Sequence, residues 1–249
     1  MLKRVRAVRW KYTVEKLWED IFPNICSYCH RGLKEGAYPP GICSFCFSGL
    51  SLRPKERNFI LLKNPGNALD NKHYPLYALA YYQEDIRHGI RALKFHDRVD
   101  FSKSLGGLMA IFFHEVLKDY QNDVTPKIIA LPLHSKRARE RGYNQVKLVL
   151  EEMQKHIHVD DWSYLMHREK STRRQSECGT RQERVANISN AFQISQPERL
   201  ENQTVWLMDD VVSSGASMWE GAEALAATNA QVRLLAIASN MRTDYKENI

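Results

Sequence analysis

The sequence has no long apolar run, and none approaches the ~20 residues that a helix needs to cross a bilayer. Residues 1–16 alternate cations with single apolar residues, so they lack the continuous apolar core of a signal peptide. These absences predict a cytoplasmic protein without a transmembrane segment. The 249 residues, 43% of them hydrophobic, are enough for one α/β domain with a core and a small additional module.

Cysteine is also scarce, with five residues in the chain, of which four form two close pairs. Without an export signal, this usage favours metal binding over disulfides. Two Cys-x-x-Cys pairs can place four thiolates around Zn²⁺ at about 2.3 Å. We therefore predict a structural zinc site, with no position left for water, formed by Cys26, Cys29, Cys43 and Cys46.

Two features of the cysteine pattern need separate interpretation. The gap between the pairs, residues 30–42, is slightly shorter than in most zinc ribbons. His30 completes a Cys-x-x-Cys-His haem-attachment pattern, but that chemistry needs export and would leave the second pair unexplained. Cys178 is the fifth cysteine, and we interpret it as a loop residue because no histidine is placed by sequence to activate it.

Acidic residues are outnumbered: 36 Lys and Arg face 29 Asp and Glu, which gives a net charge of +7. This balance favours phosphorylated or polyanionic partners. Residues 1–22 are basic and aromatic. They predict an amphipathic helix that packs on the body of the protein, with a nucleic-acid or membrane contact as the alternative.

The most informative stretch is residues 205–217, an apolar run that ends in Asp209 and Asp210 and continues into small polar residues. It predicts a buried strand followed by an anion-binding loop, because Gly215 allows close approach and a helix starting near Ala216 would present free N–H groups. Carboxylates would repel a phosphate but suit hydroxyls or a phosphate-bound Mg²⁺. Together these groups indicate a ribose 5-phosphate site. The alternative is an Asp-Asp turn that caps a helix.

Two further basic segments suggest contacts with more phosphate. A buried strand at 127–133 leads into residues 134–145, with four cations and one acid at the edge where open α/β sheets bind ligands. Pyrophosphate is the natural candidate there, held by Ser135, Lys136 and Arg137; a solvated basic helix start is the alternative. We expect His134 to be a hydrogen-bonding loop residue. Residues 167–187 carry six cations against three acids and could close over a diphosphate or form a surface loop.

The remaining pattern predicts alternating strands and helices. We expect strands at 74–82, 162–166, 191–194 and 232–238, and helices at 84–95, 101–120, 146–156 and 216–228. The first two helices should cover the sheet rather than carry chemistry. Residues 51–74 predict a linker or long connection. Asn229 is expected to adopt the left-handed conformation after the last helix.

Residues 205–217 resemble the phosphoribosyl-pyrophosphate (PRPP) signature of type I phosphoribosyltransferases. The resemblance implies that Asp209 and Asp210, the candidate catalytic residues, hold the ribose 2′- and 3′-hydroxyls. It also implies that the 5′-phosphate is wrapped by Val212, Ser213, Ser214, Gly215, Ala216 and Ser217.

From about residue 22 onward, the chain resembles the ComF family. The resemblance rests on four motifs in order along the chain. They are the four cysteines; residues 131–134 with residues 141–145; residues 172–175 continuing to residues 184–187 and 191–192; and the Asp209-Asp210 loop. Two departures are Cys178, where the family usually has leucine, and Asn229, where it commonly has glycine. Residues that we expect to close over the ligand are Arg141, Thr172, Arg173, Arg174, Gln175 and Arg184.

The family implies an α/β fold with a type I phosphoribosyltransferase-like parallel sheet flanked by helices and an N-terminal four-cysteine zinc-ribbon module. We expect three parts: a basic segment at 1–22, the zinc module at 23–52 and the phosphoribosyltransferase-like domain at 74–249. The implied function is binding of PRPP with Mg²⁺ and a role in DNA uptake and natural transformation. Phosphoribosyl transfer, its acceptor and other DNA-uptake partners are left open.

A second hypothesis has no catalysis. In it, the fold is the scaffold of a competence factor that binds single-stranded DNA through basic segments and stacked aromatic residues. Trp10, Trp18, Tyr28 and Phe45 lie near cations in and around the cysteine module and are candidates for such stacking.

Overall fold

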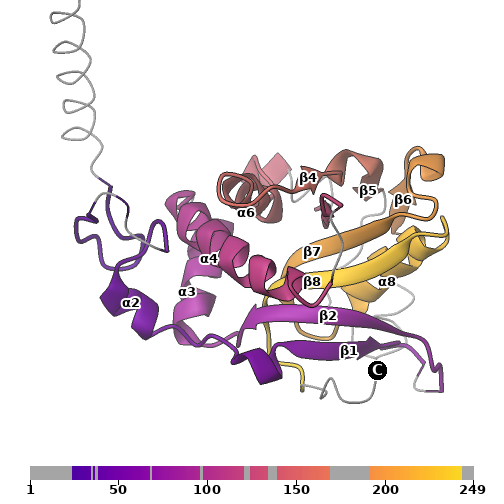
Figure 1. The fold of residues 1–249 in the computed structure, drawn as a ribbon, viewed down its shortest axis with the longest axis horizontal. Coiled ribbons are helices and arrows are strands. Elements are labelled where there is room, and N and C mark those ends of the chain that lie inside the picture. Colours follow the sequence, from indigo (N-terminus) through magenta and orange to yellow (C-terminus); the bar gives the residue numbers. More distant parts are fainter. Residues whose placement is uncertain are drawn as a thin grey trace, which may run out of the picture.

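The computed structural model describes residues 24–34, 36, 39–67, 69–95, 98–120, 124–133, 139–168 and 191–242. Its centre is a six-stranded sheet in the order β1-β2-β8-β7-β3-β4 (Figure 1). The strands are β1 (Phe59–Lys63), β2 (His73–Ala80), β3 (Lys127–Ala130), β4 (Asp160–Asp161), β7 (Thr204–Val212) and β8 (Gln231–Ser239). Only β1 runs antiparallel to its neighbour; the other adjacent strands are parallel.

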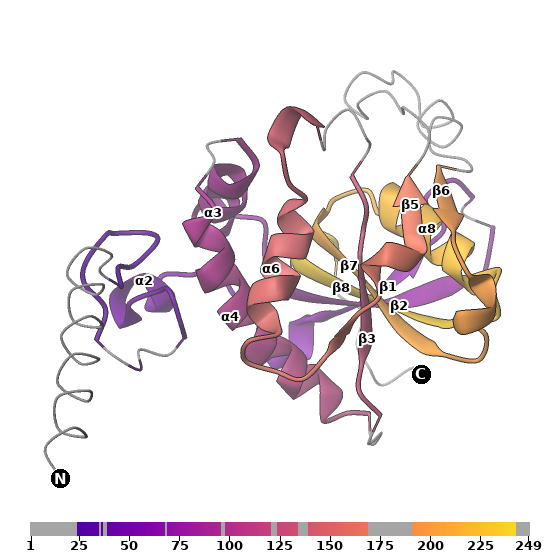
Figure 2. The ribbon, with the colours of Figure 1, turned by 90° about the horizontal axis from the view of Figure 1, so that it is seen from above.

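Helices cover both faces of the sheet (Figures 1 and 2). One face packs against α3 (Glu84–Phe95), α4 (Asp100–Leu117) and α6 (Gln145–Met153), and the other against α8 (Ala216–Ala226) and the small β5 (Met166–Arg168) and β6 (Phe192–Ile194) pair. Alternate residues of β7 supply the two cores: Trp206 and Met208 face the α3 side, and Val205 and Leu207 face the α8 side. A continuous apolar run suits a strand buried on both faces.

Most of the expected elements are confirmed, including α3 at 84–95 and a left-handed Asn229 with φ of 62°. The linker expected at 51–74 is wrong, because Phe59–Lys63 forms the edge strand β1. The strand expected at 162–166 is displaced. Residues 163–165 form a 3₁₀ turn, η2 (Ser163–Leu165), and β5 begins at Met166.

The cysteine module, which contains α2 (Ser44–Ser48), packs against α3 and α4 at one end of the protein (Figure 2). The Tyr28 ring meets the Phe101 ring edge-on at 4.9 Å. A methyl group placed on Gly89 would lie 2.9 Å from the Tyr28 hydroxyl, so glycine permits this close packing. Residues 1–22 lie outside the described residues. Within the described part of the chain, no helix has the length and apolarity needed to cross a membrane.

Candidate functional site

Strand β7 ends in the loop that precedes α8, as the sequence predicts. Gly215 has φ of 77°, and a Cβ there would lie 2.3 Å from Leu62 Cδ1, so both the backbone and the packing require glycine. Helix α8 begins at Ala216, and Ser213 and Ser214 are exposed just before it. The first N–H groups of an eleven-residue helix therefore face this loop, where they can donate to an anion.

Asp210 is buried and held at both carboxylate oxygens. Lys94 Nζ lies 2.7 Å from Oδ1, and Gln145 Nε2 donates to Oδ2 at 2.6 Å. Burial alone would lower the pKa of Lys94, but the charge and hydrogen bond of Asp210 outweigh it and raise that pKa above its usual range. The site thus contains an ion pair that was not predicted, because the helix of Lys94 was expected only to cover the sheet.

The segment from Arg141 to Gln145 supports this ion pair. Arg141 Nη1 donates to Gln145 Oε1 at 3.0 Å. The Asn144 side chain accepts from Val146 N–H to cap α6 and donates to the carbonyl of Leu131, just past β3. Tyr143 Oη donates to the carbonyl of Leu93 at 2.6 Å. The segment therefore joins α3, α6 and the end of β3 around Asp210.

Asp209 has a different environment. Strand alternation directs it to the face where Leu207 packs, away from Lys94 and Gln145. It is half-buried, and its Oδ1 accepts the backbone N–H of Asp210 at 2.8 Å. Burial, followed by the negative charge of Asp210, raises the pKa of Asp209 to about 7, although Lys94 opposes the shift. Asp209 can therefore gain or lose a proton near neutral pH.

This shift predicts a pH-dependent stability. Because an unfolded aspartate has a pKa of about 3.9, the folded chain keeps a proton that the unfolded chain releases between about pH 4 and about pH 7. Stability conferred by the raised pKa is thus lost as pH rises through this window. We expect Asp209→Asn to be more stable than the wild type at about pH 8, with the difference vanishing near pH 4. Urea unfolding at several pH values measures the difference in stability, with Asp160→Asn as the control. A difference between Asp209→Asn and the wild type that does not change with pH would contradict the prediction.

The other expected phosphate-binding residues lie outside the described residues. These are Ser135, Lys136, Arg137, Thr172, Arg173, Arg174, Gln175 and Arg184, together with His134 and Cys178. Arg141 is described, with its guanidinium carbon 5.0 Å from the centre of the Phe95 ring. The last residue of β3, Ala130, pairs with Met208 of β7, so Leu131 follows at the same sheet edge as Asp209.

Cys26, Cys29, Cys43 and Cys46 form a candidate metal centre. Their sulfur atoms all lie within 4.8 Å of one another, and Cys29 Sγ is 3.6 Å from Cys43 Sγ. A tetrahedron with Zn–S bonds of about 2.3 Å has sulfur atoms about 3.8 Å apart. Backbone N–H groups of Cys43 and Cys46 also point at Cys26 Sγ and Cys43 Sγ, which favours thiolates. The donor set and spacing fit Zn²⁺.

Curated relatives of this chain carry competence and DNA-utilization names. It is 24% identical to competence protein F of Haemophilus influenzae over 143 residues, which cover 57% of this chain and 62% of the relative. It is 26% and 27% identical to DNA utilization protein YhgH of Escherichia coli K12 and Shigella flexneri over 150 residues, 60% of this chain and 65% of each relative. The match thus spans less than two thirds of these relatives. They confirm the resemblance to the ComF family.

Neither the family models nor the solved structures identify the chain further. No protein-family model matches the chain. Among solved structures, adenine phosphoribosyltransferase from Leishmania tarentolae is similar with a TM-score of 0.28 and 12% identity, covering 84% of this chain and 90% of that one. The α/β class, the mostly parallel sheet between helices and the four-cysteine cluster are confirmed by the structure itself.

Proposed function

We propose that the chain binds PRPP at the carboxyl end of β7. The observation that carries this proposal is the junction of three groups at one strand end: the α8 N-terminus with its serines, the half-buried Asp209 and the paired Asp210. The loop would hold the 5′-phosphate through N–H and hydroxyl donors. Asp209 would accept hydrogen bonds from the ribose hydroxyls.

The two carboxylates have unequal parts in this proposal. Asp210 has its oxygens engaged by Lys94 and Gln145, so it acts as a fixed negative charge that orders the end of β7. Asp209 is the carboxylate that would meet the ligand. A Mg²⁺ ion bound to the pyrophosphate of PRPP would neutralise part of the negative charge of Asp209, because carboxylate oxygens are ligands that Mg²⁺ accepts. Transfer of the phosphoribosyl group would need an acceptor, which no described residue identifies.

Calorimetric titration with PRPP and Mg²⁺ tests the site. We expect Asp209→Asn to weaken binding at least about tenfold at about pH 8, because a hydrogen bond to a charged group contributes roughly 1.5–3 kcal/mol. Wild-type affinity should rise between about pH 6 and about pH 8 as Asp209 ionises, and the variant should lack this rise. Asp160→Asn is the matched control. Equal binding by the Asp209 variant, or no binding by the wild type, would refute the proposal.

We further propose that the chain takes part in DNA uptake and transformation as a ComF-like protein. The support is the relatives named for competence and DNA utilization, together with the net charge of +7, which suits a nucleic-acid partner. The test is the transformation frequency of a competent host that lacks the protein. If the wild-type protein restores this frequency and Asp209→Asn does not, the role in transformation depends on the PRPP site. Full restoration by the variant would separate the two.

A further inference from the structure

The solvent-facing side of α3 is basic and aromatic. Arg87, Arg91 and Phe95 recur every four residues, so they share one face of the helix. All three are exposed, and Phe95 retains 62% of its accessible surface. The acids of the helix, Glu84 and Asp85, lie in its first turn. Among the described residues, neither Arg87 nor Arg91 forms an ion pair.

Helix α3 also connects the two sites described above. At its carboxyl end, Phe95 follows Lys94, the partner of Asp210, and Arg141 lies over its ring. Towards its start, His88 lies 6.5 Å from the Tyr28 ring of the cysteine module. At about 1.5 Å per residue, roughly 10 Å of helix separates His88 from Phe95. The helix is therefore a short bridge between module and sheet edge.

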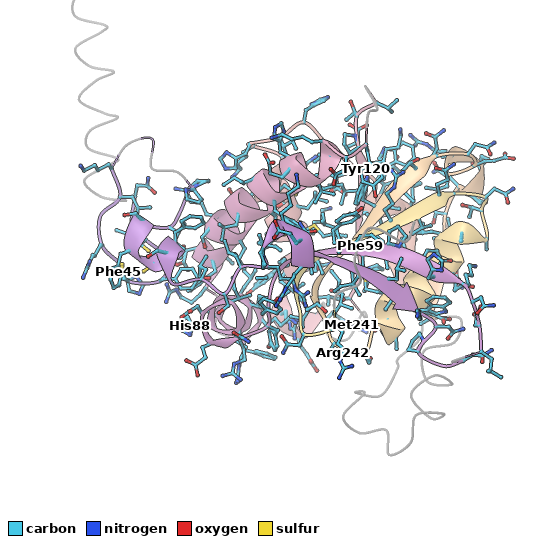
Figure 3. All side chains as sticks on the ribbon, turned by 60° about the horizontal axis from the view of Figure 1, so that its bottom comes forward. Phe45, Phe59, His88, Tyr120, Met241 and Arg242 are labelled. Carbon is cyan, nitrogen blue, oxygen red and sulfur yellow. The ribbon has the colours of Figure 1, made fainter. Side chains whose placement is uncertain are left out.

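The cysteine module, which packs against α3, carries a second exposed ring beside an arginine. Phe45 is 70% exposed, and the Arg31 guanidinium carbon lies 5.5 Å from the centre of its ring. Figure 3 labels Phe45 on the module and His88 on the adjoining part of α3. An exposed aromatic ring beside a guanidinium group offers a face on which an unpaired base can stack. A second ring with an arginine neighbour thus lies on the module that packs against α3.

We infer that the α3 surface, defined by Arg87, Arg91 and Phe95, binds single-stranded DNA and leads it towards the Asp209 edge. Unpaired arginines match phosphates, and exposed rings match unpaired bases, whereas a duplex keeps its bases stacked inside. An acidic peptide would satisfy the arginines but leave the rings without a role. The inference rests on the proposed role in DNA uptake and names the residues that would contact the DNA.

Fluorescence anisotropy with a labelled oligothymidine of about 20 nucleotides tests this surface in the full chain. We expect Arg87→Glu with Arg91→Glu to weaken binding at least about tenfold and to lower the slope of log K against log salt by about 1.4, or 0.7 for each lost phosphate contact. Phe95→Ala should weaken binding at least about fivefold through lost stacking. Lys63→Glu with Arg199→Glu makes the same charge change on exposed residues of β1 and η4 (Pro197–Arg199) and is the matched control.

Three results of the binding experiment would overturn the inference. Wild-type binding by the α3 double variant would exclude the surface, and an equal loss in the control would indicate net charge alone. Tighter binding of polyglutamate than of oligothymidine would identify an acidic protein partner instead. PRPP titration of the Arg87→Glu, Arg91→Glu double variant should be unchanged. If the wild type binds oligothymidine and fails to bind PRPP, the PRPP proposal fails while the DNA surface stands.

Discussion

Replacing Lys94 with Met should destabilise the protein by roughly 3–5 kcal/mol, because it leaves the buried carboxylate of Asp210 without its countercharge. For a domain of this size, each kcal/mol lowers the melting temperature by roughly 2–4 °C. Gln145 still donates to Asp210, but a neutral amide compensates a buried charge only in part. Thermal and urea unfolding measure the loss.

Two comparisons isolate the buried pair. Lys118→Met breaks an exposed pair with Glu115 and should cost less than about 1 kcal/mol. Combining Lys94→Met with Asp210→Leu removes both charges, so the double variant should be more stable than Lys94→Met alone. A Lys94 variant no less stable than the Lys118 variant would show that the 2.7 Å ion pair contributes nothing to folding.

Removing zinc should unfold the cysteine module while the sheet persists. Structural zinc sites in small peptides contribute apparent binding energies of about 10–16 kcal/mol at neutral pH. The described residues between 24 and 50 form one short helix, α2. We expect about one zinc per chain in the purified protein. Chelation or Cys43→Ser should increase amide exchange in residues 24–50 and leave β7 protected.

The matched control is Cys178→Ser, which changes a cysteine outside the two pairs. It should retain the metal and the exchange pattern of the wild type. A reduced, folded wild-type protein without bound metal would contradict a zinc site at these four cysteines. Exchange in the first turns of α3 should also rise on chelation, because Tyr28 packs between Gly89 and Phe101.

The features that the sequence predicts correctly are local ones. The end of β7, the glycine before α8 and the two cysteine pairs each depend on neighbouring residues whose chemistry is visible in a short window. The edge strand β1 was missed because its apolar run, Phe59–Leu62, is short and surrounded by residues typical of turns.

The supporting part of the site could not be predicted in this way. Lys94 and Asp210 are separated by 116 positions, and only the packing of α3 against the sheet brings them together. In the sequence, Lys94 is one more cation at the end of an amphipathic helix, where lysine is common for reasons of helix charge alone. Gln145 belongs to the motif at residues 141–145, which the sequence shows. Its contact with Asp210, however, depends on the start of α6, which Asn144 caps.

The sheet order has a consequence for how the chain matures during synthesis. β8, the last of the described strands in chain order, lies in the middle of the sheet between β2 and β7. The β1–β2 hairpin therefore cannot join the other strands until β8 has emerged from the ribosome. Because long-range parallel pairing is slow to form, the nascent chain carries two incomplete half-sheets with unpaired edges. Its dependence on chaperones should be greatest just before residues 231–239 appear.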